Sequence, residues 1–388
     1  MSSKLVPEVR FKEFSGEWED KKLGEITNIV MGQSPSSSSY NSNDNGIYLI
    51  QGNADIKNRK TAPRIWTTES KKECKIDDII LTVRAPVGYV AKSLHNACIG
   101  RGVCAIRNKK DYYLDFIYYY LLNFEKEWEN LGQGSTFTAI GTNDIKNLKI
   151  LIPPTPQEQQ KIANTFSSLD NLIEAQTKKV ELLKSHKKGL MQKLFPRDGA
   201  KVPEIRFKEF SGEWEEKPIS DLADRYDNLR IPISATDRTE GTTPYYGANG
   251  IQSYISGYTH DGEFILIAED GANDLKNYPV QYVNGKIWVN NHAHVLQGKR
   301  KITNNIFLMY AIKNLNMEPY LVGGGRAKLN ANIMMKILIL IPPTPQEQQK
   351  IADTLSSLDN LIEAQNKKIE LLKEHKKGLM QKMFVGDK

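Results

Sequence analysis

The feature that most constrains the fold of this 388-residue chain is a repeat that covers only parts of it. Residues 6–19 recur at 202–215 with one difference in 14 positions, and residues 151–195 recur at 340–384 with six differences in 45. The stretches between these copies show no convincing similarity to each other. A solenoid is excluded, because every unit of a solenoid must resemble its neighbours in order to stack on them.

The repeat divides the chain into a constant frame and two variable domains. Length alone favours two or three compact units. We expect a leader at 1–19, a first variable domain at 20–150, a helix and linker at 151–201, a repeated leader at 202–215, a second variable domain at 216–339 and a C-terminal helix at 340–388. A constant frame with two unlike domains is suited to presenting two different recognition surfaces at a fixed separation.

Each copy of the longer repeat opens with signals for the start of a helix. Thr155 suits the N-cap, Pro156 the first helical position and Glu158 the carboxylate of a capping box. Apolar residues then recur at alternating steps of four and three, the spacing of a coiled-coil seam. The expected seam residues are Ile162, Phe166, Leu169, Ile173, Gln176, Val180 and Leu183 in the first copy and Ile351, Leu355, Leu358, Ile362, Gln365, Ile369 and Leu372 in the second. The pattern predicts two rods, each near 60 Å long at about 1.5 Å per residue.

A seam of this kind needs a partner helix. The two copies are each other's equivalent partners within one chain, and an approximate two-fold relation between the halves would make them antiparallel. Gln176 and Gln365 would then meet near the middle, where polar residues fix register. The alternative is a coiled coil between two chains, which we consider weaker because pairing within one chain has the higher effective concentration.

Charge and composition exclude some classes of protein. A net charge of +7 permits binding to a polyanion but does not require it. Lysines at 178, 179, 184, 187, 188 and 193, repeated at 367, 368, 373, 376, 377 and 382, form a basic stripe that we interpret as a solvated helix face in preference to a phosphate contact. Without an apolar run long enough to cross a bilayer or an N-terminal secretion signal, the chain is expected to be cytoplasmic. Cys74, Cys98 and Cys104 lack paired spacing, so we expect buried free thiols.

The first variable domain mixes short β-type runs with one aromatic helix. The expected strands are Ile47–Ile50, Ile79–Val83, Val103–Ile106 and Leu148–Ile152, and the helix is Tyr112–Leu122. This predicts an α+β fold in which polar loops join the strands.

These loops, and a second set in the other variable domain, hold the side chains that base reading requires. Arg pairs with guanine edges, and Gln or Asn with adenine edges, in the DNA major groove. The candidate DNA-binding residues are Ser34, Gln51, Asn53, Lys57, Arg59, Arg84 and Arg101 in the first domain and Arg230, Tyr246, Asn249, Asn291, His292, Arg326 and Lys328 in the second. For any single loop, an ordinary surface loop remains the alternative.

Three motifs that could suggest catalysis or cofactor binding do not have the required pattern. His292 and His294 share one face of an expected strand, but no third metal ligand is evident, so we favour structural histidines. Glu269 and Asp270 are adjacent and point to opposite faces of a strand, which argues against a paired-carboxylate mechanism. The glycines from Gly323 lack Walker spacing. We therefore expect no catalytic, cofactor or metal site in this chain.

Together, several motifs resemble those of the specificity subunits of type I restriction-modification systems. The motifs are the duplicated Ile152-Pro-Pro-Thr-Pro-Gln-Glu-Gln-Gln-Lys-Ile162 segment, the Phe-Ser-Gly-Glu-Trp leaders, Tyr245-Tyr-Gly-Ala-Asn-Gly250 and Ile267-Ala-Glu-Asp-Gly271. The resemblance covers essentially the whole chain.

The resemblance implies two α/β target-recognition domains, each reading one half of a bipartite asymmetric DNA target, separated by paired antiparallel helices. It also implies that the helices dock two modification subunits, which resemble adenine methyltransferases. S-adenosylmethionine would bind to those subunits, and ATP and magnesium to restriction subunits that translocate and cleave DNA. This chain, which has neither an Asn-Pro-Pro-Tyr motif nor a Walker motif, would be non-catalytic. The alternative is a coiled-coil adaptor whose two domains bind proteins.

Overall fold

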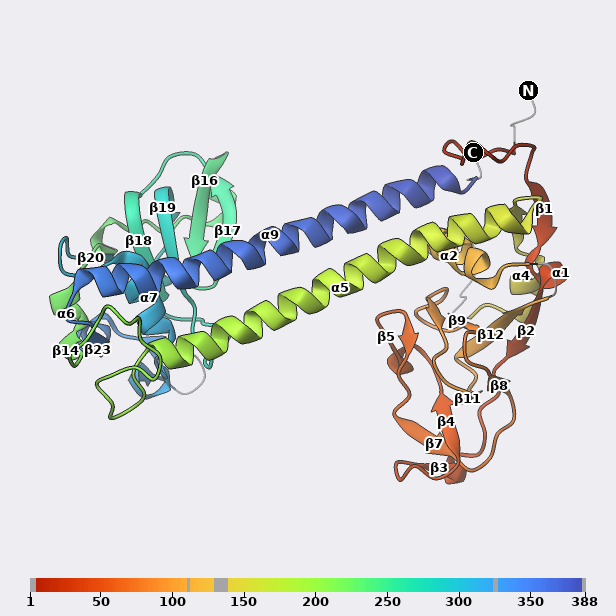
Figure 1. Cartoon of the computed structure of the whole chain (residues 1–388), viewed down its shortest axis with the longest axis horizontal. Coiled ribbons are helices and arrows are strands. Elements are labelled where there is room, and N and C mark those ends of the chain that lie inside the picture. The colour runs from red at the N-terminus through yellow and green to blue at the C-terminus, as the bar shows by residue number, and fades with distance from the viewer. Residues whose placement is uncertain (1–4, 110–111, 129–138, 324–326, 386–388) are drawn as a thin grey trace. The chain divides into compact units, whose positions relative to one another are not determined.

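A computed structural model describes residues 5–109, 112–128, 139–323 and 327–385 (Figure 1). The chain forms two compact units: unit 1 contains residues 1–176 and 368–388, and unit 2 contains residues 177–367. The expected α+β architecture, with two β-sheet regions and two long helices, is confirmed. None of the helices within the described ranges is long and apolar enough to span a membrane.

The described residues of unit 1 form three sheets. The largest has the spatial order β2 (Thr27–Met31), β12 (Val103–Asn108), β9 (Ile79–Thr82), β10 (Val90–Lys92), β6 (Lys60–Thr61) and β5 (Ile56–Lys57). The second has the order β3 (Tyr40–Asn41), β7 (Ile65–Thr67), β4 (Ile47–Ile50), β11 (Ala97–Ile99) and β8 (Glu73–Cys74). The third pairs β1 (Glu19–Lys22) with β13 (Lys149–Ile152). The apolar runs predicted as strands therefore lie in sheets, and every residue of β9 is buried, as expected for a strand with neighbours on both sides.

The helices of unit 1 share a core with the largest sheet and with β13. Among the described residues they are α1 (Leu23–Ile26), α2 (Leu114–Phe124), α4 (Thr142–Asn147), the first part of α5 (Pro156–Leu194) and the last part of α9 (Pro345–Met383). The aromatic residues of α2 are buried in one core with Trp18, Phe166 and Phe384. Residues from the leader, the first variable domain and both long helices therefore share one hydrophobic core.

Unit 2 has one main sheet. Its spatial order is β15 (Ala223–Arg225), β20 (Ala293–Gly298), β18 (His260–Ala268), β19 (Val280–Val289), β16 (Glu240–Gly247) and β17 (Gly250–Ile255). Two smaller sheets pair β14 (Glu215–Pro218) with β23 (Leu338–Ile341) and β21 (Leu321–Val322) with β22 (Lys328–Leu329). The helices among the described residues are α6 (Ile219–Leu222), α7 (Asn305–Lys313), α8 (Ala331–Met334), the last part of α5 and the first part of α9 (Pro345–Met383).

The long helices run antiparallel within each unit. In unit 1, Phe166 stacks on Phe384, and further along α5 Asp170 meets Lys376, which precedes Phe384 in the chain. In unit 2, Lys187 pairs with Asp359, while the end of α5 packs in one core with the start of α9. The expected seam residues are all buried or half-buried, and the seam joins two helices of the same chain.

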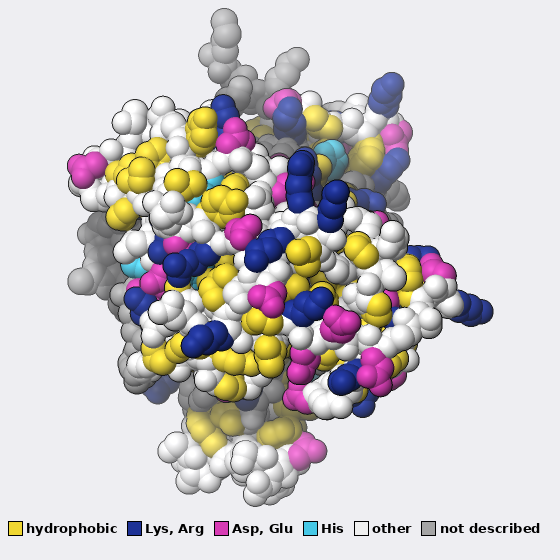
Figure 2. Space-filling model, turned by 90° about the vertical axis from the view of Figure 1, so that its left-hand side faces the viewer, with side chains coloured by type: hydrophobic (Ala, Val, Ile, Leu, Met, Phe, Trp, Pro, Cys, Tyr) yellow, Lys and Arg dark blue, Asp and Glu magenta, His cyan; other side chains and the backbone are white. Residues whose placement is uncertain are grey.

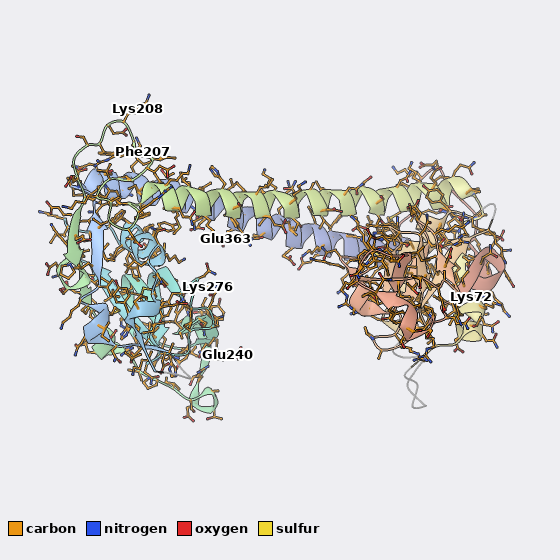
Figure 3. The ribbon with its side chains drawn as sticks, turned by 90° about the horizontal axis from the view of Figure 1, so that it is seen from below. Lys72, Phe207, Lys208, Glu240, Lys276 and Glu363 are labelled. Atoms are coloured by element: carbon orange, nitrogen blue, oxygen red, sulfur yellow. The ribbon has the colours of Figure 1, made fainter. Side chains whose placement is uncertain are left out.

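Each leader connects the end of one long helix to the start of the other. In unit 1 the Val9 amide donates to the Lys382 carbonyl oxygen, and in unit 2 the Ile205 amide donates to the Lys193 carbonyl oxygen. Phe207 and Lys208 mark the second leader beside the paired helices in Figure 3. The near-identical leaders therefore make the same contact in both units.

Two details of the helices differ from the sequence prediction. Both carboxylate oxygens of Glu158 bind Arg10, so this carboxylate serves an ion pair with the leader and does not complete a capping box with Thr155. Lys187 and Lys376, interpreted as part of a solvated stripe, are only 15% and 16% exposed and form ion pairs between the helices. Both differences have one cause: charged partners distant in sequence are close in the fold.

The three cysteines are buried and free, as predicted. Burial raises the pKa of the Cys104 thiol to about 12. This thiol therefore stays protonated and serves as a small core side chain.

Candidate nucleic-acid interface

Three of the loops that carry candidate DNA-binding residues in the first variable domain meet at one edge of unit 1. The Gln33 amide donates to the Ile99 carbonyl oxygen at 2.8 Å, and the Gly100 amide donates to the Ile50 carbonyl oxygen at 2.8 Å. The Arg101 amide donates to Ser34 Oγ at 3.2 Å. The loops beginning at residues 32, 51 and 100 therefore form one surface, although they are distant in sequence.

Two glycines allow these loops to approach each other. A Cβ atom on Gly102 would lie 2.1 Å from the Gln51 carbonyl oxygen, and one on Gly32 would lie 2.1 Å from the Gly100 carbonyl oxygen. Both distances are too short for any larger residue. The glycines of this region thus serve close packing of backbone against backbone.

Five candidate side chains of this domain are exposed and form no hydrogen bond or ion pair with any other described residue. They are Gln51, Asn53, Lys57, Arg84 and Arg101. Arg84 belongs to the same edge, because the Val83 amide donates to the Gly102 carbonyl oxygen. Their amide and guanidinium groups are therefore available to a ligand, whereas Ser34 is half-buried and supports the Arg101 backbone.

Arg59 has a different environment. Its guanidinium group binds both carboxylate oxygens of Glu125 and lies over the Tyr89 ring at 4.0 Å. Burial disfavours its charge, but the Glu125 carboxylate outweighs this effect and raises the pKa of Arg59. Arg59 therefore holds the β5–β6 turn against the body of the domain.

In unit 2, the candidate loops meet around the segment 269–273. The Asn249 side chain donates to the Gly271 carbonyl oxygen at 2.9 Å and accepts from the Asn273 amide at 3.0 Å. His292 Nδ1 lies 2.5 Å from Asp270, and Lys328 Nζ lies 3.1 Å from Glu269. The hairpin between β16 and β17, the turn before β20 and the start of β22 are thus tied to one segment.

A buried ionic cluster lies beneath this surface. Arg230 donates to Glu269 at 2.7 Å and to the Ala293 carbonyl oxygen at 2.8 Å. His294, 1% exposed, contacts Asp227 through Nδ1 at 2.7 Å and the Leu329 carbonyl oxygen through Nε2 at 2.8 Å. Because that carbonyl oxygen can only accept, Nε2 carries a hydrogen.

The carboxylates of this cluster are stabilised in their charged form. Burial opposes the charge of Asp227, but hydrogen bonding to His294 outweighs it and lowers the pKa of Asp227. Burial likewise opposes the charge of Glu269, and Arg230 and Lys328 outweigh it and lower the pKa of Glu269.

No sequence pattern indicated that Asp227 and Glu269 would lie beside His294. Together these three residues offer ligand atoms within 4.8 Å of one another, which is compact enough for a metal ion. Arg230 and Lys328 already supply positive charge to the same carboxylates, however. The arrangement is that of a structural ion cluster that holds the loops in place.

The remaining candidates in unit 2 have different exposures. Asn291 is exposed and without a side-chain partner among the described residues. Tyr246 is half-buried, and burial raises the pKa of its hydroxyl group. Arg326 lies outside the described residues. The side chains of Arg230, Asn249 and His292 form contacts within the domain. The candidates therefore divide into side chains that are available to a ligand and side chains that support the loops.

The charge on this unit is mixed. On the face shown in Figure 2, Lys and Arg side chains are interspersed with Asp and Glu and form no single basic patch. Lys276 and Glu240, both exposed, lie on the same side of unit 2 in Figure 3. Nonspecific attraction to a polyanion is accordingly modest on this surface.

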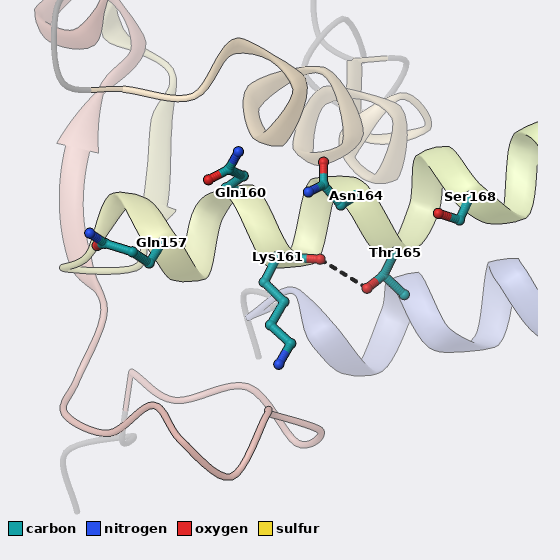
Figure 4. A pocket seen from close by; sticks show the side chains of 6 residues that line it. All are labelled: Gln157, Gln160, Lys161, Asn164, Thr165 and Ser168. Atoms are coloured by element: carbon teal, nitrogen blue, oxygen red, sulfur yellow. Dashed lines mark hydrogen bonds between the residues drawn. The ribbon is translucent and has the colours of Figure 1, made fainter.

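A second kind of surface occurs on the long helices. A shallow pocket on α5 is lined by Gln157, Gln160, Lys161, Asn164, Thr165 and Ser168 (Figure 4). The equivalent pocket on α9 is lined by Gln346, Gln349, Lys350, Asp353, Thr354 and Ser357. The spacing places each set on one helix face. The two sets differ only in Asn164 against Asp353, so each unit presents almost the same polar surface.

Comparison with known proteins identifies the family. The family model described as the type I restriction modification DNA specificity domain matches residues 15–184 and again residues 211–374. A putative type I restriction enzyme specificity subunit of Haemophilus influenzae is 47% identical over 148 residues, which is 38% of either chain. A type I restriction enzyme specificity subunit of Methanocaldococcus jannaschii is 24% identical over 96% of this chain and 93% of its own.

The fold also matches a solved structure. The crystal structure of a type I restriction-modification S subunit from M. genitalium superimposes with a TM-score of 0.69 at 19% identity, covering 99% of this chain and 100% of that one. At that identity the match shows a shared fold. With the family model matching both halves, the chain belongs to the family of type I restriction-modification DNA specificity subunits.

Proposed function

We propose that this chain is the non-catalytic DNA-reading subunit of a type I restriction-modification complex. Each variable domain would bind one half of a bipartite asymmetric target. The observation that carries the proposal is the pairing of two unlike loop surfaces with two near-identical frame segments. A protein that bound the same ligand twice would not need unlike loops.

The available side chains of the first surface match the chemistry of base edges. Arg84 and Arg101 suit guanine, Gln51 and Asn53 suit adenine, and Lys57 suits a phosphate. In the second domain Asn291 is the exposed candidate without a side-chain partner among the described residues. Base readout needs side chains held at fixed positions, and the ionic cluster with Arg230 supplies that support in unit 2.

The supporting residues matter for this function in a different way. Arg59, Asn249 and His292 have partners within their own domains, so we propose that they determine the shape of the loops and do not contact bases. Their replacement would alter base reading through the loops.

We further propose that the paired polar surfaces on α5 and α9 dock two modification subunits. Most residues of the two pockets are exposed, and the two sets are nearly the same. Two nearly identical surfaces suit two copies of one partner. S-adenosylmethionine would be bound by these partners, and ATP and magnesium by restriction subunits.

The direct test is to map adenine methylation across a genome in cells with and without this chain, with its modification subunit present in both. The proposal predicts bipartite methylated sites that vanish when the chain is deleted. If methylation is unchanged, the DNA-reading function is wrong and a protein-binding adaptor becomes the better account.

A further inference from the structure

Three side chains from three different elements meet at one point in unit 1. Tyr119 of α2 donates its hydroxyl hydrogen to Asp170 Oδ2 of α5 at 2.9 Å, and Lys376 of α9 donates to Asp170 Oδ1 at 2.6 Å. The Lys376 ammonium group also lies over the Tyr119 ring at 5.2 Å. The variable domain is therefore bonded to both long helices through a single carboxylate.

Unit 2 contains the same arrangement. Tyr310 of α7 donates to Asp359 of α9 at 2.5 Å, and Lys187 of α5 donates to both oxygens of that carboxylate at 2.5 Å. The Lys187 ammonium group lies over the Tyr310 ring at 4.9 Å. Asp359 and Lys187 are the repeat equivalents of Asp170 and Lys376, whereas the tyrosines belong to the non-repeated domains.

The two variable domains show no convincing similarity in sequence, so a contact that both of them make is informative. Both of their helices carry Phe-x-x-Tyr, as Phe116 to Tyr119 and as Phe307 to Tyr310. The phenylalanines pack on equivalent frame residues: Phe116 on Trp18 and Phe384, and Phe307 on Trp214 and Phe195.

A further contact is shared at the start of these helices. Gln159 accepts a hydrogen bond from the Tyr113 amide, and its equivalent Gln348 accepts one from the Asn304 amide, both at 3.0 Å. Two domains of unlike sequence thus attach to the frame by the same groups.

The tyrosine hydroxyl groups are suited to this contact. Tyr119 and Tyr310 are 2% and 1% exposed. Burial and the neighbouring Asp170 carboxylate raise the pKa of Tyr119 far above its ordinary value, and Asp359 does the same for Tyr310. Both hydroxyl groups keep their protons, and a hydrogen bond to an ionised carboxylate is roughly twice as strong as a neutral one.

We propose that Tyr119 and Tyr310 are positioning residues for target reading, each fixing the angle of its recognition domain against both long helices. This inference rests on the proposed DNA-reading function. The aromatic packing of Phe116 and Phe307 attaches each domain to the frame. Apolar contacts are non-directional, however, and permit small rotations of the domain against the long helices. The hydrogen bonds that join the tyrosine, the carboxylate and the lysine are directional and prevent this rotation of the domain. They therefore determine which distances between half-sites are accepted.

The test uses the whole chain reconstituted with its modification subunit. Tyr119→Phe and Tyr310→Phe delete one hydroxyl group each and keep the ring. Tyr118→Phe is the matched control, because Tyr118 is buried on the same helix and its hydroxyl group has no hydrogen-bond partner among the described residues. Methyl transfer is measured on duplexes with the native half-sites and a spacer that is native or one or two base pairs longer or shorter.

We expect the preference for the native spacer over altered spacers to fall roughly tenfold in either variant, given the large effect of small misplacements on reaction rates. Half-site preference should be unchanged, and Tyr118→Phe should behave as the wild type. A merely structural role would lower methylation on all spacers equally and leave their ratio intact, which would overturn the proposal.

A second variant covers the case in which a tyrosine variant does not fold. Lys376→Met keeps an unbranched side chain of nearly the same length and removes the ammonium group that bonds Asp170 to α9, while Tyr119 and Asp170 stay paired. An unchanged spacer ratio in a folded Lys376→Met chain also overturns the proposal. If the wild-type complex itself shows no dependence on half-site sequence, the DNA-reading function fails instead, so the two failures are distinguishable.

Discussion

Arg10 binds Glu158 through two parallel hydrogen bonds, with Nε and Nη2 each 2.7 Å from a different carboxylate oxygen. Arg206 and Glu347 repeat this geometry at 2.8 Å. Glu158 is almost fully buried, and Arg10 also donates to two carbonyl oxygens of its own leader. The pair therefore connects the fold of the leader to the first turn of α5.

Arg10→Met should lower the free energy of unfolding by about 3 to 5 kcal/mol, because it leaves a buried carboxylate without a partner. The double variant Arg10→Met/Glu158→Leu should lose much less, since no charge remains buried. Urea unfolding of the single and double variants measures this difference. If the stability losses of Arg10→Met and Glu158→Leu, measured separately, added up to the loss of the double variant, the two side chains would not be coupled and the ion pair would have no special importance for the leader.

Stability should depend on pH through His260, which is 2% exposed and bonded to the Tyr226 carbonyl oxygen. Burial lowers the pKa of His260 below its ordinary value of 6.5. As pH falls below 6.5, the unfolded chain takes up a proton that the folded chain resists, so stability is lost as pH falls toward the folded pKa.

The variant His260→Gln removes this titration. Its free energy of unfolding should decline less steeply than that of the wild type as pH falls from 6.5, as measured by urea unfolding at several pH values. Parallel curves for the two proteins would show that His260 does not titrate differently on folding.

The local part of the fold could be predicted from sequence, and particular segments show why. The start of α5 at Pro156 follows from capping and proline preferences, and strands such as Ile47–Ile50 follow from apolar runs between turn residues. These signals act over a few residues and need no knowledge of the tertiary fold.

The partners of charged side chains could not be predicted in this way. Asp170 and Lys376 are 206 residues apart, and Arg59 and Glu125 are 66 apart. A heptad pattern marks which face is apolar, but it does not say which carboxylate a lysine on that helix will meet. For the same reason the sequence could not separate Arg84, which is available, from Arg59, which is not. Phe-x-x-Tyr was visible in both domains, but two matching residues carry weight only once both are seen to touch equivalent frame positions.

The docking surfaces predict a change in stoichiometry. Ser168→Trp places a bulky ring in the pocket on α5 (Figure 4) and should reduce the number of bound modification subunits from two to one. Ser357→Trp should do the same on α9, and the double variant should bind none. Native mass spectrometry of the assembled complexes counts the subunits.

The control is Ser185→Trp, an exposed position on α5 outside the pocket where the two copies already differ. It should leave two modification subunits bound. Two subunits on the Ser168→Trp/Ser357→Trp chain would place the docking surface elsewhere.

Base reading by the first domain predicts a one-sided effect. Arg84→Ala should weaken methylation by about 1 to 3 kcal/mol, as loss of one base contact does, and relax sequence preference in one half-site. Lys208→Ala removes the same charge from the second leader, outside both variable domains, and should leave preference intact. Equal effects of both substitutions would indicate general electrostatic attraction, and an unchanged rate with Arg84→Ala would remove Arg84 from the interface.

Exchange of one variable domain tests whether the chain carries two independent DNA readers on one frame. Residues 20–150 are replaced by the corresponding domain of a relative with a different target, and the methylated sites are mapped by genome sequencing. We expect a new first half-site, an unchanged second half-site and the original spacing between them. A change in both half-sites, or in neither, would show that the two domains do not read DNA independently.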